Sequence, residues 1–249
     1  MFGKHFYNKN IRNIVVLFGT VFNDISIKRL KSNGTVDKHF KVPISYGPAQ
    51  KYLTMLDQKT STTGKYNTAI SLPRMAFEIT QLTYDGTRKL QTTRRIHKVN
   101  DTDSTKLISL YTPVPYNFDI ELSVMVKNSD DGTQILEQIL PFFTPEFQVT
   151  MNEMSIMGVK RDIPIIFTGM TSEDTYQGDL MTRRSLIHTL QFTIHGHIYG
   201  PTKDQGIIKE VDVNAGANFI IADDLNVDVK PDPTTADPDD DYGYTTTIT

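Results

Sequence analysis

The sequence predicts an α+β fold built mainly from antiparallel strands, with two or three flanking helices. Three observations favour this class. Apolar and polar residues alternate over several long stretches, which is typical of strands with one buried face. Helical spacing of apolar residues is confined to residues 8–22, 48–56 and 131–140. Strands and helices do not follow one another in a repeating β-α-β order, which separates this chain from the parallel α/β class.

The first element is an amphipathic helix over residues 8–22, for which Asn8 or Asn10 is the candidate cap. Five apolar residues lie at helical spacing along it: Ile11, Ile14, Val15, Phe18 and Phe22. The β-branched run at residues 15–17 also suits a strand, so that alternative stays open.

Two strands, at residues 25–30 and 40–45, are expected to form a hairpin. They are joined through residues 32–35, where Asn33 and Gly34 supply the positive dihedral angles of a tight turn. Residues 48–56 predict a short helix. The stretch 58–67 is rich in Thr, Ser, Lys and Gly and predicts a surface loop.

The central unit of the chain spans residues 115–147. Period-two alternation predicts a strand over 116–126, and Asp131 with Gln134 has the spacing of a capping box. A helix should therefore begin there and end at Pro141, which lacks an amide proton. Its apolar stripe should pack on the strand and comprises Ile135, Leu136, Ile139 and Leu140.

Six further strands are predicted on both sides of this unit: residues 72–84, 88–98, 107–112, 147–155, 162–172 and 184–199. The last has an apolar set of even positions, Leu186, Leu190, Phe192 and Ile194, and a polar set of odd positions, Thr189, Gln191, Thr193, His195 and His197. One face should be core and the other should meet water or a partner. His188 falls on the apolar face, and we expect it to bond a backbone carbonyl.

Composition predicts a chain able to bury a sizeable core, with 249 residues of which 38% are hydrophobic. It has no cysteine, which excludes disulfides and thiolate chemistry and suits assembly in a reducing cytoplasm. No apolar run approaches membrane-spanning length, and the N-terminal residues lack the apolar core of a signal peptide.

The charge is uneven. From residue 222 to the end there are eight aspartates and one lysine, a formal charge of −7, against −3 for the whole chain. Three prolines accompany them. This composition predicts a disordered acidic tail over 222–249, either solvated or docked on a basic neighbour, after one domain over 1–221.

The chemical candidates are weak. His195 and His197 have the two-residue spacing of a strand metal site, but no third ligand has a recognisable spacing. Asp130 and Asp131 are explained by turn and cap duties. The basic residues Arg74, Arg88, Lys89, Arg94, Arg95 and Lys98 lack the interleaved aromatics that stack bases. We therefore expect no enzyme activity, no metal and no cofactor.

Short motifs provide a more specific signal. The run from Ile135 to Phe147 resembles the tail-completion and sheath-stabilising proteins of contractile-tailed bacteriophages, in the myovirus family. Further motifs of that family recur in the same order: Met1-Phe2-Gly3, Phe6-Tyr7-Asn8, Ile27-Lys28-Arg29, Val42-Pro43-Ile44, Leu72-Pro73-Arg74, Lys160-Arg161-Asp162-Ile163 and Arg183-Arg184. The resemblance spans about residues 1–200.

The resemblance implies a tail-terminator-like fold and a hexameric ring in the virion, at the head-proximal end of the tail, assembled in the host cytoplasm. There the ring caps the tube and sheath and offers a surface to the capsid neck. The implied partners are other copies of the chain, the tail sheath protein, the tube or tube-terminator protein and a neck or head-completion protein. No membrane is involved, and DNA only passes through the ring.

Candidate interface residues come from these motifs and from the polar strand face: Phe2, Phe6, Tyr7, Arg161, Asp162, Arg183, Arg184, His195 and His197. Two alternatives stay open. The protein could occupy another ring of the same tail, such as the tube terminator or neck collar. The second alternative, which the basic strand residues and the His195–His197 pair support less well, is a small nucleic-acid-binding module or metal-dependent nuclease.

Overall fold

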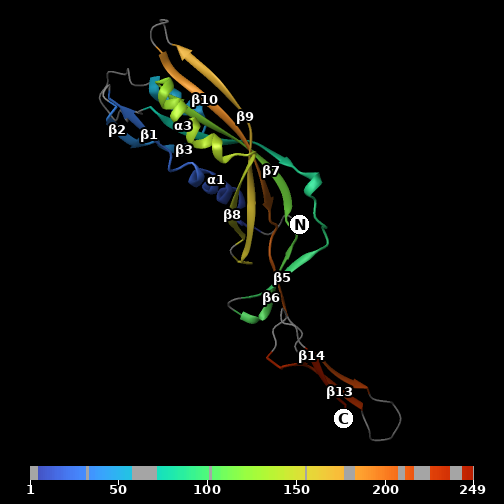
Figure 1. The fold of residues 1–249 in the computed structure, drawn as a ribbon. Helices are drawn as coiled ribbons and strands as arrows, with labels where there is room; N and C mark the ends of the chain where they lie inside the picture. Colours follow the sequence, from blue (N-terminus) through green and yellow to red (C-terminus); the bar gives the residue numbers. More distant parts are fainter. Residues whose placement is uncertain are drawn as a thin grey trace, which may run out of the picture. The chain divides into compact units, whose positions relative to one another are not determined.

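The computed structural model confirms the α+β class, with three α-helices and 14 strands among the residues it describes (Figure 1). Those residues are 5–31, 34–57, 72–100, 103–154, 156–176, 183–206, 211–215, 225–235 and 243–248. The chain groups into two compact units. Unit 1 comprises residues 1–8, 90–113 and 199–249, and unit 2 comprises residues 9–89 and 114–198. The expected boundary at residue 221 stays a prediction.

Unit 2 is built on a six-stranded sheet in the order β3-β4-β7-β10-β9-β8. All neighbours are antiparallel except β3 and β4, which are parallel. The central pair β7 and β10 is in unbroken register from Val126 opposite Leu186 to Val114 opposite Ile198. The strands are β3 (Ile44–Tyr46), β4 (Arg74–Tyr84), β7 (Val114–Val126), β8 (Glu146–Met154), β9 (Val159–Tyr176) and β10 (Arg183–Ile198).

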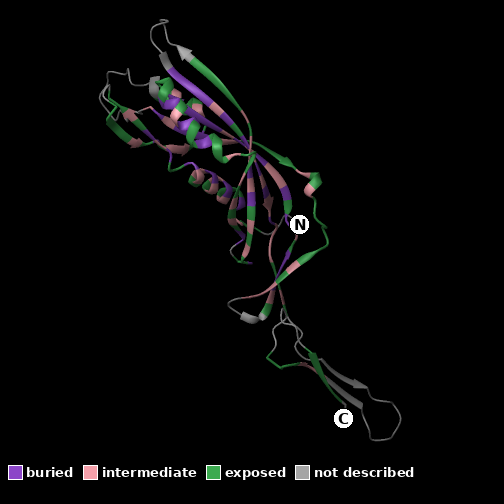
Figure 2. Cartoon of the chain, viewed as in Figure 1, coloured by how far each residue is buried: buried purple, intermediate pink, exposed green. Residues whose placement is uncertain are grey.

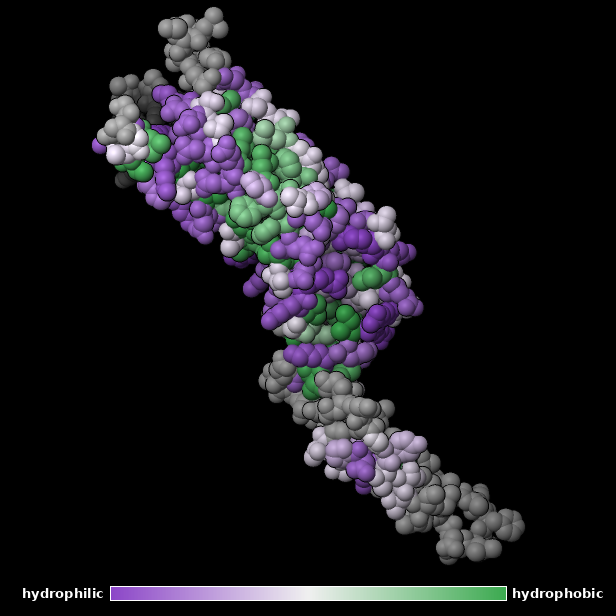
Figure 3. Space-filling model, viewed as in Figure 1, coloured by the Kyte–Doolittle hydropathy of each residue, from purple (hydrophilic) through white to green (hydrophobic). Residues whose placement is uncertain are grey.

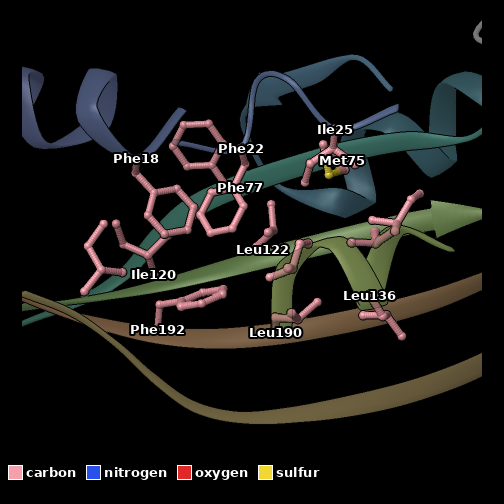
Figure 4. Packing of buried hydrophobic residues seen from close by; sticks show 14 of the residues in the cluster. Phe18, Phe22, Ile25, Met75, Phe77, Ile120, Leu122, Leu136, Leu190 and Phe192 are labelled. Carbon is pink, nitrogen blue, oxygen red and sulfur yellow. The ribbon is translucent and has the colours of Figure 1, made fainter. Parts of the chain in front are cut away.

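One face of this sheet carries the main core, as the alternation along the strands predicts (Figure 2). The apolar residues expected in β7 and β10 are buried there, among them Ile120, Leu122 and Phe192. The predicted first helix, α1 (Asn10–Val21), lies against them. Phe18 fills the centre, with its ring centroid 5.1 Å from that of Phe77 and 5.4 Å from that of Phe192 (Figure 4).

The opposite face of the sheet has a smaller apolar cluster under α2 (Ala49–Asp57), the short helix that the sequence predicts. Tyr52 of α2 packs on Ala76, Met125 and Ile187. The predicted loop at residues 58–67 lies outside the described residues.

The predicted hairpin forms, but its second strand is earlier than expected. β1 (Ser26–Leu30) pairs with β2 (Val36–Lys41), whereas residues 44–46 leave the hairpin and pair with β4 as β3. Pro43 separates the two strands and has no N–H for a ladder. Its carbonyl instead accepts from the amide of Met75, 2.9 Å away, at the start of β4.

The helix α3 (Ser129–Ile139) and its proline stop confirm the predicted helix, which begins two residues earlier than expected and is followed directly by a 3₁₀ turn, η3 (Leu140–Phe142). Ile135, Leu136 and Ile139 of the predicted stripe are buried, whereas Leu140 is exposed. The predicted capping box is wrong. The residue flanking the helix is Asn128, and Asp131 lies inside the first turn, where Arg29 of β1 donates to both its oxygens at 3.2 and 2.6 Å. Asp131, which the local spacing assigns to a helix cap, is therefore bound by Arg29, a residue distant in the sequence.

Two glutamines of α3 also bond the free edge of β1. The side-chain oxygens of Gln138 and Gln134 accept from the amides of Ser26 and Lys28 at 3.4 and 3.1 Å. The Gln138 amide donates to the carbonyl of Ser26 at 2.8 Å. The side chains of Gln134 and Gln138 thus provide the hydrogen-bond partners that a further strand would otherwise provide at the exposed edge of β1. We call the Arg29–Asp131 pair and these bonds the α3 clamp.

Unit 1 contains two three-stranded antiparallel sheets, in the orders β11-β6-β5 and β12-β13-β14. The strand expected at 88–98 starts only at residue 95. Residues 86–88, which belong to unit 2, form a 3₁₀ turn, η2 (Gly86–Arg88), and the side chain of Asp85 accepts from the amide of Thr87. The strands are β5 (Arg95–Asn100), β6 (Asp103–Tyr111), β11 (Lys203–Gly206), β12 (Val211–Ala215), β13 (Leu225–Asp232) and β14 (Gly243–Ile248).

The acidic segment is described only in part. β13 and β14 fall within it and pair from Val227 opposite Ile248 to Asp232 opposite Gly243. Residues 225–230 alternate Leu or Val with Asn, Asp or Lys, a strand pattern that a count of charges overlooks. Disorder in the rest of 222–249 stays a prediction.

His188 of β10 is buried, as expected, but its partner is not a carbonyl. Its Nδ1 lies 3.0 Å from the hydroxyl of Ser172 on β9. Its ring also fits against the backbone of α3 at Gly132, where a Cβ would lie 2.8 Å from Nε2. Burial lowers the pKa of His188, because the charged ring is poorly solvated there.

The α3 clamp predicts the effect of Arg29→Met. The variant leaves the carboxylate of Asp131, which is 2% exposed, without its cation, whereas Arg29 itself is 36% exposed. We expect a loss of about 3 kcal/mol in the free energy of unfolding, measured by chemical denaturation. Lys41→Met is the matched control, because its pair with Asp24 is open to solvent and should contribute less than about 1 kcal/mol. Equal losses in the two variants would contradict the clamp.

His188 predicts a pH dependence of stability. Its pKa is lowered in the folded state, so the unfolded chain, with a histidine pKa of about 6.5, binds the proton first as pH falls. Its contribution is therefore fully present above about pH 6.5 and is lost at lower pH. We expect His188→Gln to lose less unfolding free energy than the unchanged protein between pH 7 and pH 5. A parallel pH profile in the two proteins would show that His188 does not titrate in this way.

Candidate interaction surface

An apolar groove lies open on the surface of unit 2. It has a volume of about 660 Å³ and is bordered by the end of α1, the start of the β1 hairpin and the α3–η3 turn. Hydrophobic side chains gather on the face that carries these elements (Figure 3). The lining residues are Val21, Phe22, Asp24, Ile25, Glu137, Gln138, Ile139, Pro141, Phe142, Phe143 and Phe147.

The two phenylalanines after Pro141 have different roles in this groove. Phe143 turns inward, and its ring centroid is 5.1 Å from that of Phe192 and 6.1 Å from that of Phe22, with which it stacks. Phe142 turns outward and is 65% exposed. Because a 3₁₀ turn places consecutive side chains on different sides, one aromatic ring anchors the turn and the other is left at the surface.

The rim of the groove is acidic. Glu137 is exposed on α3, and Asp24 is exposed after α1, although its carboxylate contacts Lys41 Nζ at 2.9 Å. An apolar floor with a charged rim is the usual anatomy of a protein interface, in which buried aromatic side chains dominate the affinity.

A polar cluster joins two of the predicted interface residues. His197 Nδ1 lies 3.3 Å from Glu153 Oε1, and its Nε2 lies 3.2 Å from a guanidinium nitrogen of Arg161. Arg161 also approaches Glu153 at 3.5 Å, and the Glu153 side chain is only 2% exposed. These contacts give His197 and Arg161 a role inside the subunit, in which a buried carboxylate is matched by a cation.

The other predicted residues are placed as follows. His195 is half-buried, and burial together with the charge of Arg88 lowers its pKa. Asp162 is exposed and accepts from the hydroxyl of Thr150. Arg183 and Arg184 begin β10, with side chains outside the described residues, and Phe2 is outside them as well.

The aromatic pair before α1 is strongly exposed, with Phe6 at 50% and Tyr7 at 61%. The next residue, Asn8, is fixed within unit 1. Its side-chain amide donates to the carbonyls of Tyr199 and Gly200 at 3.0 and 2.7 Å.

Three of the basic residues singled out in the sequence have close partners within their own unit. In unit 2, Arg88 binds Asp85 and Asn117 at 2.8 and 2.7 Å, and Arg74 lies 4.6 Å over the ring of Tyr52. In unit 1, Arg95 donates to the hydroxyl of Tyr111 at 2.6 Å. Each of these guanidinium groups is held by a close neighbour, which differs from the row of free cations that tracks a nucleic-acid backbone.

The described residues contain no group of three or more His, Cys, Asp or Glu side chains that could hold a metal ion. None of the described helices is long and apolar enough to cross a membrane.

Sequence reasoning missed the groove. Helical spacing predicted a buried stripe of Ile135, Leu136, Ile139 and Leu140, of which the first three are buried. Most of the residues from 140 to 147 are exposed. The overlooked signal is the pair Phe142-Phe143 directly after a helix-ending proline, because a chain that turns at that point cannot bury both rings.

Comparison with known proteins agrees with the motifs. Residues 5–249 match the family described as "T4-like virus Myoviridae tail sheath stabiliser". The chain is also 32% identical over 251 residues to "Tail completion protein gp15" of Enterobacteria phage T4. The aligned region covers 96% of this chain and 90% of the relative. With nearly the whole chain matched in both comparisons, this protein belongs to the T4-like Myoviridae tail sheath stabiliser family.

Proposed function

We propose that this tail protein forms a hexameric ring at the head-proximal end of a contractile tail. The ring caps the tube and sheath and presents its other surface to the capsid neck. The observation that carries the proposal is the match to tail sheath stabilisers over residues 5–249. The name of the T4 relative, a tail completion protein, supports a position at the end of the assembled tail.

The proposed work is geometric rather than catalytic. A subunit with two different complementary surfaces makes head-to-tail contacts, and these close into a ring when the rotation at each contact is right. The apolar groove supports this view, since exposed apolar side chains around a hollow mark an interaction site.

Symmetry explains how such a ring could hold a sheath under tension. A ring repeats each weak surface contact once per subunit against an equally symmetric partner, and linked contacts strengthen one another through effective concentration. The proposed partners are the sheath protein, the tube or tube-terminator protein and a neck or head-completion protein. The acidic residues of 222–249 are proposed to contact a basic surface of one of them.

Electron microscopy tests the proposal directly. We expect class averages of tails assembled with the protein to show a six-fold ring at the head-proximal end, because six identical subunits in a closed ring have that symmetry. Tails assembled without the protein should lack that density and lose sheath subunits from the same end. The control is the same preparation with the protein added back.

A particle that stays monomeric in solution and on assembled tails would overturn the proposed ring. Density for the protein at the opposite end of the tail would overturn the proposed position while leaving the ring intact. A ring of six-fold symmetry found only on the capsid side of the neck would favour the collar alternative.

A further inference from the structure

We propose that the apolar groove receives the aromatic segment His5–Asn8 of a neighbouring copy of this chain. The inference rests on the proposed ring and names the contact that closes it. Phe6 and Tyr7 would enter the groove beside Phe142. The two surfaces are different parts of one chain, as a head-to-tail contact requires.

Size and chemistry fit this occupant. A hollow of about 660 Å³ lies within the range of pockets that enclose compact apolar ligands. Phe6 and Tyr7 are 50% and 61% exposed, which leaves two large apolar surfaces without cover in a free subunit. Aromatic side chains placed in a partner's hollow are the typical anchors of protein interfaces.

Charge selects this end of the chain. No Asp or Glu precedes Asp24, whereas Lys4, Lys9 and Arg12 carry positive charge. The groove rim carries the exposed carboxylate of Glu137, together with Asp24, which is paired with Lys41. The acidic C-terminal segment, with eight aspartates, would be repelled by that rim, so charge complementarity assigns the groove to the N-terminal segment.

The local backbone prepares the segment for docking. Asn8 is held through its side chain by two carbonyls, and Lys9 adopts the left-handed conformation with φ 59°. A fixed residue directly beside the aromatic pair reduces the conformational entropy that docking removes. The residue that follows Phe6 and Tyr7 is therefore held in place, while the side chains of both aromatic residues are exposed to solvent.

Cross-linking tests the contact, because the chain has no cysteine of its own. His5→Cys and Glu137→Cys, each at an exposed position, are made in separate chains and mixed under assembly conditions before oxidation. We expect covalent dimers in the mixture and a ladder up to the full ring when both substitutions are in one chain. Lys51→Cys on α2 replaces Glu137→Cys in the control and should give no dimer with His5→Cys.

The outcomes are distinguishable. A bond within one chain in the double variant, without a ladder, would show that the segment occupies its own groove and would overturn the inference. Rings visible by electron microscopy without any cross-link would contradict this contact but not the proposed ring. Unchanged protein that forms no ring in solution or on tails would remove the proposed function itself.

A second measurement uses the affinity of the subunits. Phe6→Ser with Tyr7→Ser should raise the concentration for half-assembly by about tenfold or more, since anchor residues dominate an interface. Phe142→Ser should do the same from the other side of the contact. Val16→Ser, at an exposed apolar position outside both surfaces, is the matched control. Assembly at unchanged concentrations in both anchor variants would contradict the inference.

Discussion

The buried carboxylate of Asp131 is the constraint on which this side of unit 2 depends. It is 2% exposed and has one cationic partner in the described structure, Arg29, which comes from a separate hairpin. An uncompensated charge at that position would be costly, so α3 and β1 must stay together. The bonds of Gln134 and Gln138 to β1 fix the same pairing at two further points.

This constraint also shapes the apolar groove. The groove is bordered by the end of α1, the entry to β1 and the turn after α3. The clamp fixes β1 against α3. The ring of Phe143, which stacks on Phe22 and makes a tilted contact with Phe192, fixes the turn against the core. Phe142 is then exposed as a consequence of the way in which its neighbours are held.

Much of this fold could be predicted from local patterns, and most of the site could not. Alternation predicted β7 and β10 because each strand repeats its pattern over many residues. The role of Asp131, the partner of His188 and the cluster around Glu153 were wrong or missing, because each depends on residues far away in the sequence. The groove was missed for the same reason. Its lining comes from the end of α1, the entry to β1 and the turn after α3, which no local sequence pattern connects.

The unbroken register of β7 and β10 has a mechanical consequence. The two strands have 13 and 16 residues and are antiparallel, with ladder bonds perpendicular to their length. Opposed pulls along the two strands load these bonds in shear, so that many must fail together, whereas a pull that separates the strands at one end would open one bond after another. Unit 2 is therefore stiffest along its central strands, and a subunit oriented with β7 and β10 along the line of force would transmit tension with little stretch.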